Sequence, residues 1–263
     1  MMRKLVASDM DGTLLRDDKF LDKEIYTIIY EMRRRDVGFV AASGRQYHSL
    51  KTLFAPVVDD IYFISDNGAR VLYQGEELFA YGMQRSLVNE IVDAIVDRPN
   101  TSVMLCGKKK AYTNNPRQEA FLRTGSFRFN VEFTRDFRSV DDEILKVSIV
   151  DDKDSYNSLI EMQHQFGRIA AVTFSGYDCI DFMDKSVNKG VAMAFLQERL
   201  GISKADTIVF GDNYNDVEMM AQAGTAYAMR HSPTGVKQKA DKVLGSNNDG
   251  AVITELKALF GLK

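Results

Sequence analysis

Short apolar runs alternate with helical patterns at both ends of this sequence, and this alternation constrains the fold more than any other feature. In the first third, strands are predicted at residues 3–8, 37–42 and 61–64. Asp22 is predicted to cap a helix after the first strand, with apolar residues on one face at Ile25, Ile28, Ile29 and Met32. Parallel strands need a crossover connection, usually a helix, so this βαβαβ order predicts a parallel sheet.

The same alternation returns after residue 188. A helix is predicted to end at Gly201, a favourable C-terminal cap. It is followed by a predicted strand, helix, strand and helix at residues 207–210, 215–221, 226–229 and 252–260. The predicted fold class is therefore α/β, with a doubly wound, Rossmann-like core built from both ends of the chain.

The predicted order of helices and strands is different in the middle of the chain. Predicted helices at residues 88–96 and 155–166 are mixed with neighbouring strands, and residues 175–178 form a hairpin signal between two of them. This mixture favours an α+β module with an antiparallel sheet. We therefore predict a core of residues 1–82 and 185–263, interrupted by an α+β cap domain of residues 83–184.

Charge and hydropathy argue against several classes of partner. The net charge is −3 and the only basic run is Lys108 to Lys110, which is typical of a solvated turn, so no nucleic-acid partner is expected. The N-terminal apolar run is too short for a signal peptide, and no segment approaches the roughly 18 apolar residues of a membrane span. A cytoplasmic protein without a membrane partner is expected. The sequence does not decide the oligomeric state.

Polar residues follow the predicted core strands where each strand ends. In open α/β sheets, ligands bind outside the carboxyl ends of the strands. The groups found there are Asp9 and Asp11, Ser43-Gly44-Arg45, Asp66-Asn67-Gly68, Gly211-Asp212, Asn215 and Asp216, with Lys189 at the start of a helix. All of these loops are expected to open onto one edge of the sheet.

The acidic residues at this edge cannot crowd together in ionised form, because like carboxylates raise one another's pKa. A divalent cation would resolve the conflict, and oxygen ligands without clustered His or Cys suit Mg²⁺. A lysine at a helix N-terminus and a serine hydroxyl beside backbone N–H groups suit a phosphate on the other side. The sequence therefore predicts a site for Mg²⁺ and a phosphoryl group.

Four motifs, in this order along the chain, resemble those of the haloacid dehalogenase (HAD) superfamily of phosphatases. They are Ser8-Asp9-Met10-Asp11-Gly12-Thr13-Leu14, similar to the DxDGT signature, then Ser43, Lys189, and Gly211-Asp212-Asn213-Tyr214-Asn215-Asp216, similar to the GDxxND motif. The cap position and other segments resemble the Cof-type subgroup (HAD-IIB, with a C2B cap): Asn67-Gly68-Ala69, Ala228-Met229, Lys242-Val243 and Asp249-Gly250-Ala251. His231-Ser232 departs from the Asn-Ala more usual in that subgroup.

The resemblance implies that Asp9 is the nucleophile and forms an aspartyl-phosphate. Asp11 would protonate the leaving oxygen and then deprotonate the hydrolytic water, with its backbone carbonyl on Mg²⁺. Ser43 and Lys189 complete the implied catalytic set.

The same resemblance implies the binding groups. Phosphate or substrate would be bound by Ser43, Gly44, Lys189 and Asn215. Arg45 would either contact substrate or form a salt bridge. The metal site would comprise Asp9, Asp11, Asp212 and Asp216. In it, Asp212 would ligate directly and Asp216 would orient the ligands. His231 is a further candidate for contact with substrate.

The predicted function is Mg²⁺-dependent hydrolysis of small phosphorylated metabolites such as sugar phosphates, FMN or pyridoxal phosphate. One alternative is a hexose-phosphate phosphomutase, which also begins with an aspartyl-phosphate but requires a sugar hydroxyl to attack it. Another is a non-catalytic module that senses phosphate. Turnover of an aryl phosphate would exclude the sensor, and dependence on a sugar bisphosphate activator would identify a mutase.

Overall fold

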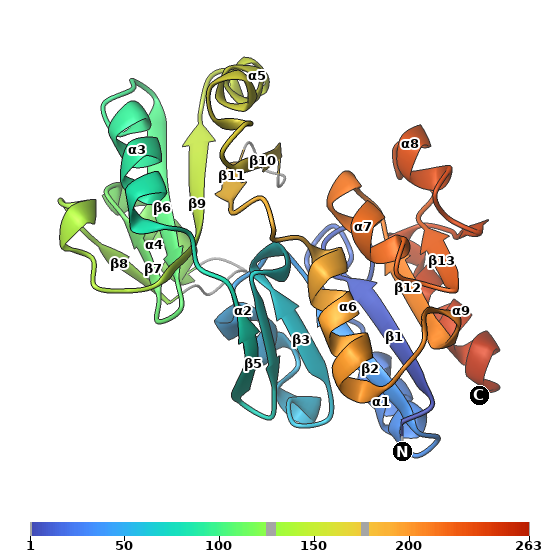
Figure 1. The fold of residues 1–263 in the computed structure, drawn as a ribbon. Helices are drawn as coiled ribbons and strands as arrows, with labels where there is room; N and C mark the ends of the chain where they lie inside the picture. The colour runs from blue at the N-terminus through green and yellow to red at the C-terminus, as the bar shows by residue number, and fades with distance from the viewer. Residues whose placement is uncertain (1, 125–129, 175–178, 263) are drawn as a thin grey trace. The chain divides into compact units, whose positions relative to one another are not determined.

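The computed structural model describes residues 2–124, 130–174 and 179–262. The chain forms two compact units, one of residues 1–79 with 188–263 and one of residues 80–187 (Figure 1). The second unit is the part of the chain for which the sequence analysis predicts a cap. In the described parts of the chain, no helix combines the length and hydropathy that a membrane span requires.

The described strands of the first unit form one eight-stranded sheet. Their order across the sheet is β14 (Lys242–Val243), β13 (Thr225–Ala228), β12 (Thr207–Gly211), β1 (Lys4–Asp9), β2 (Val37–Ala42), β3 (Tyr62–Ser65), β4 (Arg70–Tyr73) and β5 (Glu76–Ala80). The pairs from β14 to β3 are parallel. Strands β2, β3 and β12 are buried along their whole length, as expected for parallel strands covered on both faces.

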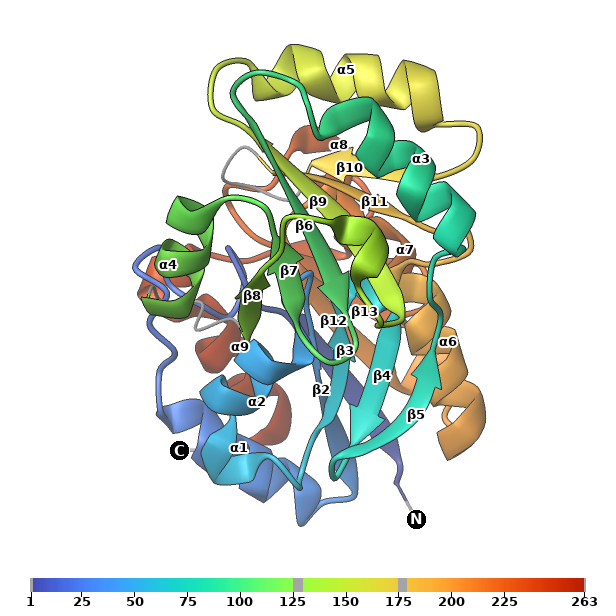
Figure 2. The ribbon, with the colours of Figure 1, turned by 90° about the vertical axis from the view of Figure 1, so that its left-hand side faces the viewer.

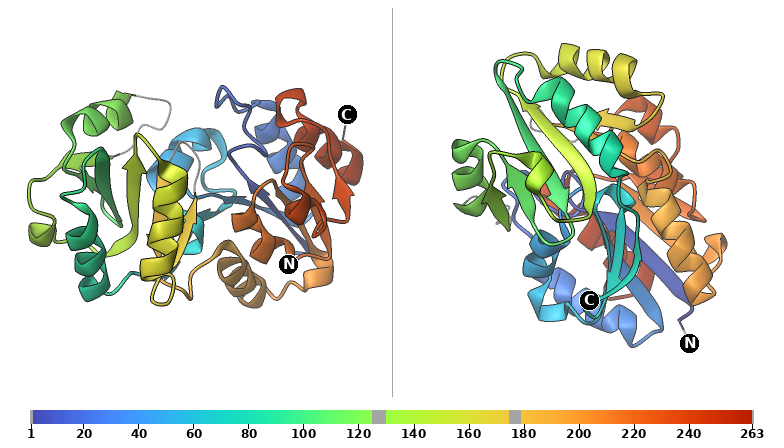
Figure 3. Two further views of the ribbon diagram at one scale, coloured as in Figure 1. Left: turned by 90° about the horizontal axis from the view of Figure 1, so that it is seen from above. Right: turned by 60° about the vertical axis from the view of Figure 1, so that its left-hand side comes forward.

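Helices cover both faces of this sheet, which confirms the predicted doubly wound core. One face packs on α1 (Glu24–Arg33), α2 (Tyr47–Leu53) and α9 (Ala251–Phe260). The other packs on α6 (Lys189–Leu200), α7 (Val217–Met220) and α8 (Thr234–Lys237). Figure 3 shows α1 and α6 on opposite sides of the sheet.

Several local features of this unit differ from the sequence prediction. The cap position of α1 is Lys23 rather than Asp22, although an Asp22 carboxylate oxygen still accepts a hydrogen bond from the Glu24 N–H. The helix expected at 215–221 is divided into a 3₁₀ turn (Tyr214–Asp216) and α7. The Asp216 carboxylate accepts hydrogen bonds from the backbone N–H groups of Asp212 and Asn213, which precede the turn. The β4–β5 extension was not predicted.

The second unit contains a six-stranded sheet among the described residues. Its order is β10 (Ala171–Phe174), β11 (Cys179–Met183), β9 (Ile144–Asp151), β6 (Thr101–Gly107), β7 (Ala111–Thr113) and β8 (Val131–Phe133). All pairs are antiparallel, as predicted, except that β7 and β8 are parallel. The chain returns between β7 and β8 through a helix, and such a crossover permits the parallel pair.

Among the residues that the structure describes, α-helices accompany this second sheet (Figure 2). Helices α3 (Arg85–Ile95) and α5 (Ser155–Phe166) pack on one face and form the apolar core of the unit. Helix α4 (Pro116–Thr124), which was not predicted, contributes Leu122 to a smaller apolar cluster with β6, β7 and β8. The predicted hairpin turn at 175–178 lies outside the described residues, while its flanking strands β10 and β11 pair antiparallel.

Candidate active site

The site lies at the carboxyl edge of the core sheet, where adjacent parallel strands end together. In the registers of β1 with its neighbours, Asp9 is paired with Ala42 and Ser8 with Phe210. The first residues beyond these strand ends therefore approach one another from distant parts of the sequence. This edge carries the first, second and fourth motifs, as the parallel order predicts.

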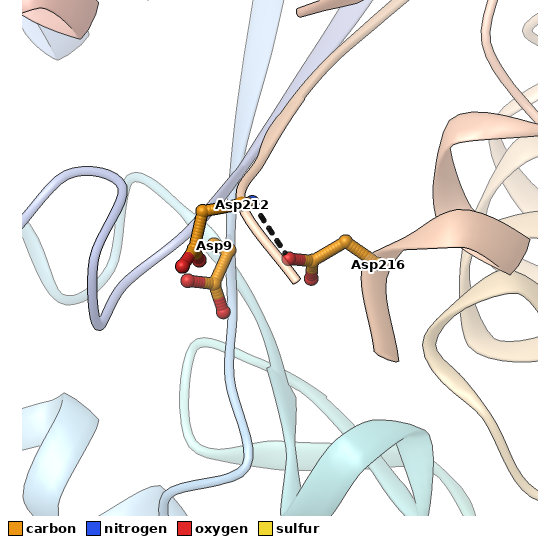
Figure 4. A group of neighbouring side chains, drawn as sticks. All are labelled: Asp9, Asp212 and Asp216. Atoms are coloured by element: carbon orange, nitrogen blue, oxygen red, sulfur yellow. Dashed lines mark hydrogen bonds between the residues drawn. The ribbon is translucent and has the colours of Figure 1, made fainter. Parts of the chain in front are cut away.

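Three carboxylates gather at this edge. Asp9, Asp212 and Asp216 each offer an oxygen, and these oxygens lie within 4.8 Å of one another (Figure 4). Asp9 and Asp216 are buried, and the side chain of Asp212 is 15% exposed. Asp216 Oδ2 accepts hydrogen bonds from the backbone N–H groups of Asp212 (3.0 Å) and Asn213 (3.1 Å). Asp216 therefore fixes the loop that presents Asp212.

Lys189 joins two of these carboxylates. Its Nζ donates to Asp9 Oδ1 at 2.5 Å and to Asp216 Oδ1 at 2.7 Å, and its side chain is fully buried. Asn188 caps α6 by accepting from the Val191 N–H, which places Lys189 in the first turn. Burial would lower the pKa of Lys189, but Asp216 and Asp9 outweigh it and raise that pKa, so the ammonium stays charged.

Negative charge accumulates around Asp9 despite this lysine. Burial raises the pKa of Asp9, and the charges of Asp216 and Asp212 raise it further, while Lys189 opposes them. Burial and Asp216 likewise raise the pKa of Asp212. A second positive charge at this point would stabilise both ionised carboxylates.

The donor atoms fit a hard divalent cation. Asp9 Oδ2 is buried and, in the described parts of the chain, has no hydrogen-bond partner. Asp212 is held in place by Thr13, whose hydroxyl donates to its Oδ1 at 3.0 Å. Gly12 has φ +84°, and a Cβ there would lie 2.5 Å from Asp212 Oδ2, so glycine allows the first motif to approach Asp212. Asp9 and Asp212 therefore each offer a carboxylate oxygen that can bind a divalent cation.

Asp11 points to a different set of partners. Arg45 donates to both of its carboxylate oxygens, at 2.6 and 2.7 Å, and Lys19 Nζ donates to its Oδ1 at 2.9 Å. Burial would raise the pKa of Asp11, but hydrogen bonds and charge from Arg45 and Lys19 outweigh it and lower that pKa. The Asp11 side chain is thus held by two cations and does not belong to the three-carboxylate group. Arg45 forms the salt bridge that the sequence analysis allowed for.

The second-motif loop lies beside these groups. Ser43 is buried, and its Oγ accepts from the Arg45 N–H at 3.1 Å, which leaves the hydroxyl proton able to donate. Asn215 Nδ2 donates to Asn67 Oδ1 at 3.1 Å. His231 Nε2 lies 3.4 Å from Asp212 Oδ2, with a partly exposed ring. His231 therefore lies at the rim of the acidic group.

Lys19 and Asn67 have close contacts to the site, and the sequence analysis assigned neither of them a catalytic or binding role. Lys19 lies in a polar loop after the first motif, and no local pattern distinguishes it from a surface lysine. Asn67 was placed at the ligand edge after the third strand, with Asp66 and Gly68, but without a role in the site. Its side chain contacts Asn215 from 148 positions away.

The chain is similar to known proteins over most of its length. Residues 6–256 match the family of haloacid dehalogenase-like hydrolases. The chain is 30% identical over 256 residues to the 5-amino-6-(5-phospho-D-ribitylamino)uracil phosphatase YbjI of Escherichia coli, covering 96% of this chain and 94% of that protein. It is 27% identical over 241 residues to the HMP-PP phosphatase of Klebsiella pneumoniae, covering 90% and 87%.

A solved structure shows the same fold along the whole chain. The protein SMU.1108c of Streptococcus mutans superposes with a TM-score of 0.88 at 27% identity, covering 98% of this chain and 99% of that one. The motifs, the doubly wound core and the family match agree with one another. The chain therefore belongs to the haloacid dehalogenase-like hydrolases, as a phosphatase whose motifs resemble those of the Cof-type subgroup.

Proposed function

We propose that this phosphatase hydrolyses small phosphorylated metabolites with Mg²⁺, through an aspartyl-phosphate on Asp9. The observation that carries the proposal is the arrangement around Asp9. One of its oxygens is bonded to the buried ammonium of Lys189, and the other is buried without a hydrogen-bond partner among the described residues. Once a divalent cation adds a second positive charge and favours its ionised form, this carboxylate can act as a nucleophile.

In the first step, a carboxylate oxygen of Asp9 attacks the phosphorus atom of the substrate. The bond between phosphorus and the leaving oxygen breaks, and Asp11 donates a proton to that oxygen. Lys189 and Ser43 stabilise the charge on the phosphoryl oxygens, with Gly44 and Asn215 completing the phosphate site. Positioning and charge stabilisation of this kind account for most of the catalysis of phosphoryl transfer.

In the second step, Asp11 removes a proton from a water molecule, and the water oxygen attacks phosphorus. The bond between phosphorus and Asp9 breaks, which releases inorganic phosphate and regenerates the carboxylate. The ion pairs of Asp11 with Arg45 and Lys19 favour its ionised form, which suits this base role. The acid role in the first step requires the protonated form, which Asp11 regains when it removes the proton from water.

The metal would be held by Asp9 and Asp212, with the backbone carbonyl of Asp11. Asp216 would orient the loop rather than ligate, since Lys189 and two backbone N–H groups already bond its oxygens. When bound, Mg²⁺ neutralises charge on the carboxylates and on the phosphoryl group. The absence of clustered His or Cys in the described acidic group, and its carboxylate oxygens, favour Mg²⁺ over softer metals.

The substrate class is proposed from the relatives and from the cap. The two curated relatives are named for different phosphorylated compounds, so the fold supports a class of substrates rather than one compound. We assign substrate choice to residues 83–184, which contain none of the predicted catalytic residues. Sugar phosphates, FMN and pyridoxal phosphate are the first compounds to test.

A panel of phosphorylated metabolites and one aryl phosphate, each assayed with and without Mg²⁺, tests the proposal. We expect Mg²⁺-dependent release of inorganic phosphate from the aryl phosphate and a marked preference among the metabolites. Rapid acid quenching should trap phosphate on the protein in a form that hydroxylamine removes, as expected for an acyl phosphate. An active enzyme from which no phosphoprotein can be trapped at any time point would contradict the covalent route.

A further inference from the structure

We propose that Asn67 is a positioning residue of the phosphate site, whose side-chain amide aims Asn215 at the phosphoryl group. The inference rests on the proposed function, in which Asn215 approaches phosphate. It concerns the short turn Asp66–Gly68 after β3, which contacts the loops of the second, third and fourth motifs. All of these contacts lie within the first unit of the chain.

The backbone of this turn has an uncommon conformation. Asp66 has φ 51° and Asn67 has φ 55°, so two consecutive residues other than glycine are left-handed, and both are buried. Asn and Asp tolerate this region better than most residues, but such a conformation persists only where surrounding contacts hold it. Strained buried turns of this kind concentrate at functional sites.

Backbone hydrogen bonds attach the turn to the second motif. The Asn67 N–H donates to the Ser43 carbonyl at 3.0 Å, and the Asp66 N–H donates to the Arg45 carbonyl at 3.0 Å. The turn is therefore attached to the Ser43–Arg45 loop at two points. The position of Asn67 is thus set by the loop that is proposed to bind phosphate.

The next residue brings the turn against the third motif. Gly68 has φ +100°, and a Cβ at this position would overlap the backbone carbonyl of Asn188. Glycine at this position allows close contact with the start of α6, where Lys189 lies. The turn is therefore packed between the loop of Ser43 and the helix that carries Lys189.

The side chain of Asn67 reaches the fourth motif. It is 2% exposed, and its Oδ1 accepts from Asn215 Nδ2 at 3.1 Å. A Cβ on Gly44 would lie 2.9 Å from the same Oδ1, so the amide is packed between both loops. An amide group has two N–H donors, and the bond to Asn67 takes one of them. The second N–H of Asn215 then has a fixed direction in which it can donate to an anionic oxygen.

Asn67→Gly separates the effect of the Asn67 side chain from the effect of its backbone. Glycine favours positive φ and keeps the N–H that bonds to Ser43, so the substitution removes only the amide group. Asn100→Gly is the matched control, because Asn100 also has positive φ (62°) but is exposed and lies in the second unit. A change caused by relief of backbone strain alone would appear in both variants.

Calorimetric titration with inorganic phosphate in the presence of Mg²⁺ is the main measurement. We expect Asn67→Gly to weaken phosphate binding about five- to tenfold, the effect of one ordinary hydrogen bond, with little change in Tm. Asn100→Gly should leave phosphate affinity unchanged. If Asn67→Gly does not fold, Asn67→Ser, whose side chain is too short to reach Asn215, replaces it in the same comparison.

A double-mutant cycle with Asn215→Ala separates positioning from general packing. If Asn67 acts through Asn215, the double variant should bind phosphate no more than about twofold more weakly than Asn215→Ala alone. Independent losses that multiply in the double variant would overturn the proposal, as would unchanged phosphate affinity in the Asn67 variants. A wild-type protein that neither binds phosphate nor hydrolyses an aryl phosphate would instead contradict the proposed function.

Discussion

The ammonium of Lys189 donates a 2.5 Å hydrogen bond to Asp9 from 180 positions away, and the lysine side chain has no exposed surface. Removing a charged group from water is costly, and the cost is offset here because two carboxylates accept from the same ammonium. The ion pair between Lys189 and Asp9 is therefore stable only while each buried charge keeps its partner. Its contribution to catalysis and its contribution to stability can both be tested.

Lys189→Met should destabilise the protein strongly. The substitution leaves Asp9 and Asp216 facing each other in a buried site, and breaking a buried ion pair in this way typically costs about 3–5 kcal/mol. Urea unfolding at neutral pH in EDTA measures the loss. Lys185→Met, at an exposed position, should stay within about 0.5 kcal/mol of the wild type. Equal stability of both variants would contradict the role assigned to the buried pair.

Removal of the metal should abolish activity. Three carboxylates with oxygens within 4.8 Å of one another need a cation to coexist with a phosphate dianion. Activity should disappear in excess EDTA and return with Mg²⁺, and Mg²⁺ should raise the Tm of the wild type by binding the folded state. The increase in Tm should be smaller in Asp212→Asn, which lacks one proposed ligand. Full activity in EDTA would show that the proposed mechanism is wrong.

The two aspartates of the first motif should fail at different steps. Asp9→Asn removes the attacking carboxylate, so no phosphoenzyme should form. Asp11→Asn keeps the nucleophile but lacks the acid and base, whose help is typically worth about 10²- to 10⁴-fold. An aryl leaving group needs little acid, so Asp11→Asn should release a burst of aryl alcohol approaching one equivalent and then turn over slowly. A comparable burst from Asp9→Asn would mean that the nucleophile is another residue.

Stability should depend on pH through Asp11. Its pKa in the folded protein is lowered, since Arg45 and Lys19 outweigh the effect of burial. A lowered folded-state pKa stabilises the protein above the ordinary value of about 4, and this stabilisation is lost as pH falls through the lowered value. The difference in Tm between the wild type and Asp11→Asn, measured in EDTA, should therefore be largest near neutral pH and shrink below about pH 4. A difference independent of pH would contradict this assignment.

Substrate preference should depend on the inserted unit. The core sheet has its own apolar clusters on both faces, and the inserted unit has a separate one, so the first unit is expected to fold alone. Replacement of residues 80–187 by a short linker should abolish discrimination between metabolites while retaining some activity on an aryl phosphate. A cooperative thermal transition is the control for folding. An unchanged order of metabolite preference would refute the role of this unit.

Local sequence patterns predicted most of the architecture of the core. The apolar positions Ile25, Ile28, Ile29 and Met32 are buried along one face of α1, as their spacing predicts. Strands β1, β2 and β12 are parallel neighbours, so the polar residues after them meet at one edge. Periodicity carries this information because each repeat reflects which side of one element is buried. The β4–β5 hairpin was missed because its turn depends on positive φ at Gln74 and Gly75, which apolar periodicity does not indicate.

By itself, the sequence determined that Asp9, Asp11, Ser43, Lys189 and Asp212 lie at the carboxyl edge of a parallel sheet. Only the tertiary structure decided the partners of each side chain. Lys189 is bonded to Asp9 and Asp216, while Asp11, only two positions from Asp9, is bonded to Arg45 and Lys19 instead. Asn67 is bonded to Asn215 across 148 positions. The direction of a side chain depends on charges and packing from distant segments, and local periodicity contains no record of those contacts.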